Sequence, residues 1–124
     1  MKKLFYVVTF AIVFFWGCNP PERNCVEFHD GSFTFTEMID GEIHTTTFTR
    51  KGDLEISEYR GHIDSASVRW VNDCEYVLKN LNPKNKQEEK PLHMKILKTE
   101  GDTYTFEYSV MGSSDKRRGK VVKY

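Results

Sequence analysis

Apolar and polar side chains alternate with a period of two along most of the chain after residue 25, and this pattern is the strongest constraint on its fold. Because successive side chains of a strand point to opposite faces of a sheet, the alternation predicts β-strands rather than helices. The segments with this pattern, or with many β-branched residues, are 32–36, 43–49, 54–57, 65–71, 75–78, 92–96, 104–110 and 121–124.

The connections between these segments are short and have the composition of tight turns. Asp40-Gly41 is a dipeptide typical of a two-residue β-hairpin, because both central positions of that turn adopt a positive φ. Glycine also lies in the connections at 51–53, 60–62 and 100–102. The one long connection, 80–90, contains a proline and a run of charged residues, so we expect a loop there, with a short helix within 85–90 as the alternative.

About eight strands joined in this way predict an all-β, antiparallel meander. A sheet with one apolar face must close on itself or pack against another layer, and the pattern offers no helix to form that layer. We therefore expect a small barrel or half-barrel of lipocalin-like architecture, a likeness of fold that does not determine function. An eight-stranded barrel is just wide enough to be filled by side chains or to hold one small ligand.

The N-terminus has the features of an export signal. Two lysines at 2–3 precede thirteen largely apolar residues at 4–16. A helix needs roughly 20 such residues to span a bilayer, whereas the apolar core of a signal peptide has about 7–15. The length of the run therefore predicts a signal peptide.

The residues after this run, Gly17 and Cys18, resemble the lipobox of bacterial lipoproteins, in which a small residue precedes the cysteine that is lipidated. Phe15 and Trp16 depart from the usual residues of that motif. The resemblance implies cleavage before Cys18 and attachment of lipid to it, which would anchor the protein to a bacterial membrane. An ordinary signal peptide or an uncleaved anchor is the alternative.

The residues that follow Cys18 support the lipoprotein interpretation. The segment 19–24 contains two prolines and no large apolar residue, which is typical of a tether. We therefore divide the chain into a signal peptide (1–17), a tether (18–24) and a single β domain (25–124). The expected location is the cell envelope, on the periplasmic face or at the outer surface.

The composition of the chain without its signal is consistent with one domain of balanced charge. Removal of residues 1–17 leaves 107 residues, with 16 basic and 18 acidic side chains. This slight acidity does not favour binding to nucleic acid, which requires a basic surface.

The two cysteines other than Cys18 form an even pair in an exported protein. Cys25 and Cys74 are therefore predicted to form a disulfide, and two buried free thiols are the alternative. On the chain-entropy model, closing a loop of about 50 residues stabilises a domain by roughly 4 kcal/mol.

The segment 70–78 combines several residues that we expect to pack near one end of the sheet. A two-residue turn at 72–73 would place Val71 opposite Cys74. The ring of Tyr76 is expected to point inward, with its hydroxyl at a wet edge. The candidates for lining a core or a ligand site are Trp70, Tyr76, Phe106 and Tyr108, and core filling is the preferred interpretation.

The chain also resembles a family of short bacterial envelope lipoproteins whose function is uncharacterised. The shared pattern in this sequence is Cys25, Gly31-x-Phe33, Arg50, Glu55 and Trp70-x-x-Asp73-Cys74-x-Tyr76-x-Leu78. The resemblance covers about residues 25–78 and supports the predicted fold and disulfide. Some members of that family carry a topoisomerase name, which nothing in this small, exported and slightly acidic chain supports.

No catalytic or metal-binding motif is evident. The histidines, His29, His44, His62 and His93, lie on separate segments without the spacing of a zinc site, and we expect surface or turn positions for them. We therefore expect no enzyme activity, cofactor or metal. Arg50 with Glu55 is the pair considered for catalysis, but a cross-strand ion pair explains it better.

These observations predict a membrane-anchored, non-catalytic module that binds an envelope protein or a small apolar ligand. Two alternatives are a lipocalin-like carrier with a true cavity, and an enzyme inhibitor or accessory subunit of an envelope complex. The volume inside the barrel distinguishes the first alternative, because a barrel filled by Trp70 and Phe106 has no room for a ligand.

Overall fold

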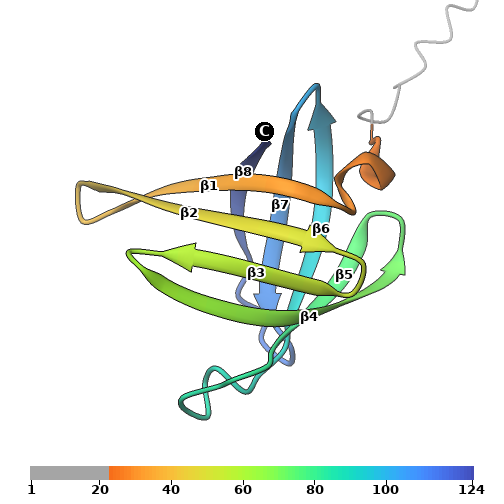
Figure 1. Cartoon of the computed structure of the whole chain (residues 1–124). Helices are drawn as coiled ribbons and strands as arrows, with labels where there is room; N and C mark the ends of the chain where they lie inside the picture. Colours follow the sequence, from red (N-terminus) through yellow and green to blue (C-terminus); the bar gives the residue numbers. More distant parts are fainter. Residues whose placement is uncertain (1–22) are drawn as a thin grey trace, which may run out of the picture.

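The computed structural model describes residues 23–124, which form a closed barrel of eight antiparallel strands in sequential order (Figure 1). The strands are β1 (Gly31–Ile39), β2 (Glu42–Lys51), β3 (Leu54–Tyr59), β4 (His62–Asn72), β5 (Glu75–Asn80), β6 (Leu92–Glu100), β7 (Thr103–Val110) and β8 (Arg117–Lys123). The predicted all-β meander is confirmed, and the sheet closes. The expected signal peptide, the lipidation site Cys18 and most of the tether lie outside the described residues.

Closure of the barrel depends on β1, which pairs with β2 along its length and with β8 over Phe33–Phe35. Every strand therefore has two hydrogen-bonded neighbours, which removes the exposed edges through which open sheets aggregate. Within residues 23–124 there is no helix that is both long and apolar enough to cross a bilayer.

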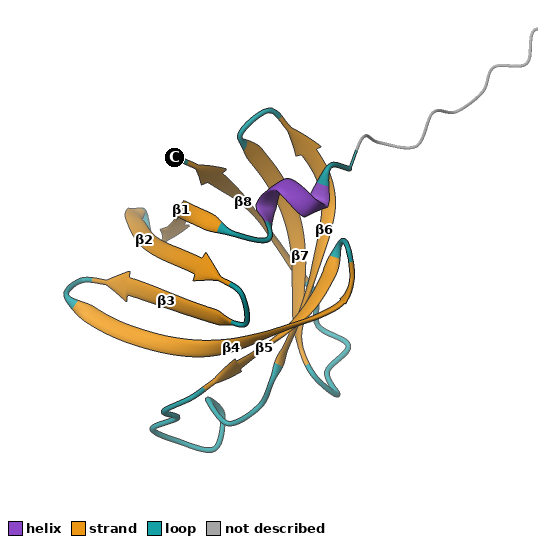
Figure 2. Cartoon of the chain, turned by 45° about the vertical axis from the view of Figure 1, so that its right-hand side comes forward, coloured by secondary structure: helices purple, strands orange, loops and turns teal. Residues whose placement is uncertain are grey.

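The connections of a meander alternate between the two ends of the barrel, and here the two ends differ. The closed end carries the turns after β2, β4 and β6, together with a single 3₁₀ turn, η1 (Cys25–Phe28), that precedes β1 and that the sequence did not predict. Figure 2 shows η1 lying over this end. The open end carries the hairpins after β1 and β3, the turn after β7 and the long loop 81–91 after β5.

The hairpin turns at the open end have the predicted chemistry. Asp40 and Gly41 have φ values of 50° and 80°, and Arg60 and Gly61 have 48° and 80°. Positive φ at both central residues is the geometry that matches the twist of a two-residue hairpin. The long connection after β5 is a loop with turns rather than a helix.

The hairpin at the β4–β5 turn differs from the prediction. Trp70 pairs with Tyr76 and Asn72 pairs with Glu75, with a register shift between the two pairs. The expectation that Val71 opposes Cys74 is therefore wrong. A bulge at this point absorbs one extra residue of β4, and the side chain of Asn72 accepts a hydrogen bond of 2.9 Å from the backbone N–H of Cys74.

The predicted disulfide links two segments at the closed end of the barrel. The sulfur atoms of Cys25 and Cys74 are 2.07 Å apart, so η1 is linked to the β4–β5 turn across 49 residues of sequence. The ring of Phe28, which is 1% exposed, packs edge-on against Tyr104 at a centroid distance of 5.0 Å. The 3₁₀ turn thus acts as a plug, held by a covalent bond and by a buried ring.

Candidate functional site

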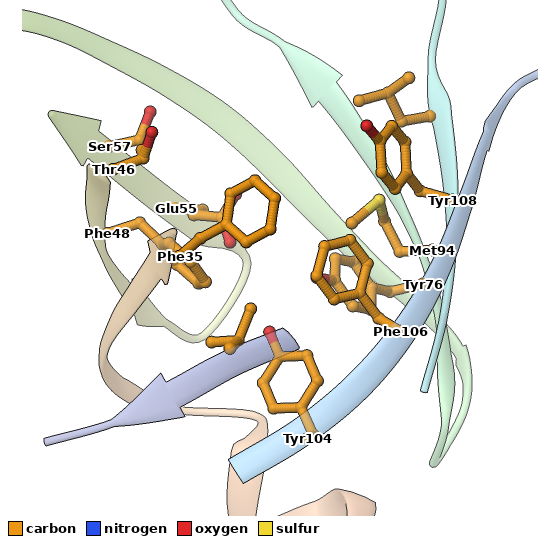
Figure 3. A pocket seen from close by; sticks show the side chains of 12 residues that line it. Phe35, Thr46, Phe48, Glu55, Ser57, Tyr76, Met94, Tyr104, Phe106 and Tyr108 are labelled. Carbon is orange, nitrogen blue, oxygen red and sulfur yellow. The ribbon is translucent and has the colours of Figure 1, made fainter. Parts of the chain in front are cut away.

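The interior of the barrel is filled near the closed end and hollow toward the open end. The hollow has a volume of about 280 Å³ and is lined by side chains from seven of the eight strands (Figure 3). Six of the lining side chains are aromatic, namely Phe35, Phe48, Tyr76, Tyr104, Phe106 and Tyr108. The polar ones are Thr46, Glu55 and Ser57. The cavity is therefore an aromatic pocket with a small number of polar groups.

The cavity exists because several inward positions carry small residues. Thr46 and Ser57 occupy inward positions of β2 and β3 where a large apolar residue would fill the barrel. On β8, Gly119 leaves space that the rings of Phe35 and Phe106 occupy, since a Cβ there would lie 2.7 Å and 2.9 Å from them. Alternation alone predicts which residues point inward, but side-chain volume decides where space remains.

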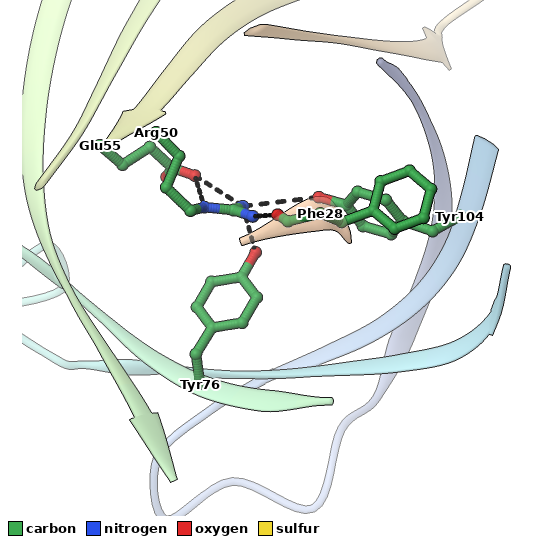
Figure 4. A network of polar contacts seen from close by, with 5 residues as sticks. All are labelled: Phe28, Arg50, Glu55, Tyr76 and Tyr104. Carbon is green, nitrogen blue, oxygen red and sulfur yellow. Dashed lines mark hydrogen bonds and ion pairs between the residues drawn. The ribbon is translucent and has the colours of Figure 1, made fainter. Parts of the chain in front are cut away.

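A buried polar network separates the cavity from the closed end (Figure 4). Arg50 is 1% exposed, and its Nη2 donates to Glu55 Oε1 at 2.9 Å and to the Tyr76 hydroxyl at 2.8 Å. Its Nη1 donates to the carbonyl oxygen of Phe28 at 2.7 Å, and the hydroxyl of Tyr104 lies 3.5 Å from Nη2. One guanidinium therefore ties the plug to strands β2, β3, β5 and β7.

The network shifts the pKa values of the side chains that form it. Burial raises the pKa of Glu55 because it disfavours the carboxylate, and the opposing attraction of Arg50 is the smaller effect. Burial likewise raises the pKa of the Tyr76 and Tyr104 hydroxyls. Burial by itself lowers the pKa of Arg50, but its interactions with Tyr76, Tyr104 and Glu55 raise it more, so the guanidinium stays charged.

Three of the four candidate lining residues do face the cavity. Tyr76, Phe106 and Tyr108 are among its lining side chains. The prediction of a wet hydroxyl on Tyr76 is wrong, because Tyr76 is 2% exposed and its hydroxyl accepts a hydrogen bond from Arg50 inside the barrel.

Trp70 lies apart from the cavity, at the closed end. Its ring stacks on His29 with centroids 3.6 Å apart, and His29 Nε2 lies 2.8 Å from the carbonyl oxygen of Asp73. The indole nitrogen of Trp70 has no hydrogen-bond partner among the described residues. Trp70 is therefore a packing residue of the closed end and is not among the side chains that line the cavity.

The pair Arg50 and Glu55 matches the cross-strand ion pair expected from the sequence, since the two residues are directly opposite in the β2–β3 register. The sequence did not single out Phe35, Thr46 or Ser57 as lining residues. The signal available for them was parity: each lies an even number of residues from an inward neighbour on its own strand.

The fold and the cavity together define a small β-barrel that is plugged at one end and has an apolar pocket that opens at the other. Among residues 23–124, no group of three or more histidine, cysteine, aspartate or glutamate side chains is placed to hold a metal ion. Comparison with models of known protein families, with curated proteins and with solved structures found no match to this chain. The resemblance to short envelope lipoproteins therefore stays a prediction.

Proposed function

We propose that the protein is a lipid-anchored module of the bacterial cell envelope that binds a small apolar ligand inside its barrel without catalysing a reaction. The observation that supports this most is the open hollow of about 280 Å³ with aromatic walls. Ligand sites are typically concave and mainly apolar with few polar groups, with volumes of roughly 300–1,000 Å³. The cavity lies just below that range, which favours a ligand of no more than two or three rings.

The expected affinity follows from the apolar surface that such a ligand would bury. About 400 Å² of ligand and wall surface together corresponds to about 10 kcal/mol at ~25 cal/mol per Å². Association costs at least about 4 kcal/mol in lost freedom of motion, which leaves about 6 kcal/mol, or a Kd of tens of micromolar. A module that binds only another protein would not require this hollow.

The proposed anchor is lipid on Cys18, which is supported by the signal-like residues 1–17. The described chain begins at the closed end, where the backbone N–H of Asn24 donates to Thr99 Oγ1 at 2.8 Å. Residues 18–24 span at most about 3.4 Å each. A tether of this length would hold the closed end toward the membrane and leave the mouth of the cavity facing away from it.

Ligand binding can be tested with the full chain in lipid nanodiscs and the neutral fluorescent probe N-phenyl-1-naphthylamine. Thr46→Trp places a large ring in the cavity, whereas Thr45→Trp places the same ring on the outer face of β2. We expect saturable binding by the wild type and by Thr45→Trp, and loss of binding in Thr46→Trp. Equal fluorescence for all three proteins would show that the probe binds only lipid and would count against the proposal.

The anchor can be tested separately with Cys18→Ala. We expect this variant to leave the membrane fraction at high salt, where electrostatic adsorption is screened. If the variant still sediments with membranes under those conditions, lipid on Cys18 is not what holds the protein there.

A further inference from the structure

The floor of the cavity, which is its end nearest the plug, exposes an acidic side chain but not the basic side chain paired with it. Glu55 lines the cavity, whereas Arg50 is not among the lining residues and is only 1% exposed. A ligand that reaches the floor therefore meets the carboxylate of Glu55 rather than the guanidinium behind it. Figure 3 shows Glu55 close to the ring of Phe35, and Figure 4 shows the guanidinium of Arg50 between Glu55 and Phe28.

The cationic side chain has its donors engaged within the protein. Nη1 of Arg50 donates to Phe28, Nη2 donates to Tyr76 and Glu55, and Nε donates to Glu55 at 3.3 Å. All three nitrogens thus bind acceptors that belong to the barrel or its plug. An acidic ligand would have to displace one of these buried contacts to reach the positive charge.

The two oxygens of Glu55 are used unequally. Both hydrogen bonds from Arg50 end on Oε1, and no residue within 23–124 donates a hydrogen bond to Oε2. The side chain is 10% exposed and Oε2 is not one of the buried atoms without a partner, so the accessible part of Glu55 includes an acceptor with unused capacity. A donor that arrives with a ligand can bind this oxygen in place of water, whereas a ligand without a donor would cover it and leave it unpaired.

The walls above this floor are built from ring faces and edges. Phe106 and Tyr108 are stacked with centroids 5.6 Å apart, and Phe35 meets Phe106 edge-on at 5.5 Å. Aromatic walls of this kind favour planar ring ligands, which can stack or make edge contacts, over a flexible alkyl chain.

Resting on the proposed function, we propose that the ligand is a small planar ring compound with one neutral hydrogen-bond donor, of the phenol or indole class, whose donor binds Oε2 of Glu55. A ligand carboxylate would place a like charge beside Glu55. An ammonium group would lose its hydration beside an Arg50–Glu55 pair whose net charge is zero. A ring without a donor would leave Oε2 unsatisfied.

The test uses four naphthalene derivatives that share one ring body, measured by displacement of N-phenyl-1-naphthylamine from the full chain in nanodiscs. They are 2-naphthol, 2-methoxynaphthalene, 2-naphthoate and 2-naphthylmethylammonium. Thr46→Trp serves as the blank, because it carries the same lipid without the cavity. We expect 2-naphthol to bind at least about tenfold more tightly than each of the other three.

A substitution at the floor sharpens the test. Glu55→Gln replaces the acceptor Oε2 by an amide donor and leaves the charge of Arg50 uncompensated, so we expect 2-naphthoate to overtake 2-naphthol in this variant. Glu58→Gln removes the same charge from an exposed position of the same strand and should preserve the wild-type order. If Glu55→Gln does not fold, the wild-type order of affinities alone decides.

The outcomes separate this inference from the function on which it rests. If the four compounds bind the wild type equally and none binds Thr46→Trp, the cavity binds ligands but the preference for a neutral donor is refuted. Tightest binding by the carboxylate or by the ammonium compound refutes the preference in the same way. If no compound and no probe distinguishes the wild type from Thr46→Trp, the proposed function itself fails.

Discussion

Nη2 of Arg50 and Oε1 of Glu55 lie 2.9 Å apart inside the barrel, on side chains that are 0% and 10% exposed. The pair is directly opposite across β2 and β3, close to where those strands turn at the closed end. A buried ion pair is costly to desolvate, and removal of one partner leaves an uncompensated charge. The stability of the plug should therefore depend on the two side chains being present together.

The first prediction concerns Arg50→Met. This change removes the counterion of Glu55 and a donor to the carbonyl oxygen of Phe28, so we expect a loss of about 3–5 kcal/mol in the free energy of unfolding. Chemical denaturation followed by far-ultraviolet circular dichroism measures it. The double variant Arg50→Met/Glu55→Leu should be more stable than Arg50→Met, because no carboxylate is then buried alone. Equal or lower stability of the double variant would contradict this account.

The second prediction concerns the pH dependence of stability. Burial raises the pKa of Glu55 above its ordinary value of 4.5, so the folded protein keeps this proton at pH values where the unfolded chain has lost it. The contribution of Glu55 to the free energy of unfolding is therefore fully present below about pH 4.5, and it is lost as the pH rises through the folded-state pKa. The slope for one such group is at most about 1.4 kcal/mol per pH unit.

The measurement compares the unfolding free energy of the wild type with that of Glu55→Gln from pH 4 upward, since the variant does not titrate at this position. We expect the wild type to lose stability relative to the variant as the pH rises, and the difference then to become constant. A difference that grows in favour of the wild type with rising pH would mean that attraction to Arg50 outweighs burial.

The third prediction concerns the disulfide between Cys25 and Cys74, which closes a loop across 49 residues. The double variant Cys25→Ser/Cys74→Ser should lose about 4 kcal/mol of stability on the chain-entropy model. Dithiothreitol should destabilise the wild type by a similar amount and leave the double variant unchanged. An effect of dithiothreitol on the double variant would point to a different origin of the loss.

The sequence predicted the strands well because alternation and turn chemistry are local. The inward positions of Phe33, Tyr104 and Phe106 follow from parity alone, and the hairpin at Asp40-Gly41 follows from the need for positive φ. Closure of the sheet follows in turn, since a single apolar face without a covering layer must be buried. The N-terminal features stay predictions, because they precede the described residues.

The candidate site was predicted only in part, because it depends on distances across the barrel. Nothing local shows that the Tyr76 hydroxyl meets Arg50, 26 residues away in sequence. The bulge at Val71 also has no clear signal, and it changes the register of the β4–β5 hairpin. Trp70 was expected to pack near one end of the sheet, and it does so against Tyr76, but its stacking on His29 of the N-terminal segment could not be predicted from local sequence.

The fourth prediction concerns Gly119, which allows two rings to line the cavity. A Cβ at this position would lie 2.7 Å from Phe35 and 2.9 Å from Phe106, closer than such atoms approach in proteins. In Gly119→Ala the rings must therefore move toward the hollow. Overpacking of this kind costs about 1–3 kcal/mol, and we expect the low end because the empty cavity accepts the displaced rings.

The same displacement should reduce the space for a ligand. Gly119→Ala is therefore expected to reduce the free energy of binding of N-phenyl-1-naphthylamine by more than it reduces the free energy of unfolding. Lys120→Ala, at an exposed position of the same strand, is the matched control and should change neither property. Gly119→Ala/Phe106→Leu should regain binding, because the smaller side chain of leucine makes room for the added methyl group. If Gly119→Ala binds the probe as the wild type does, the probe does not occupy the space next to Phe35 and Phe106.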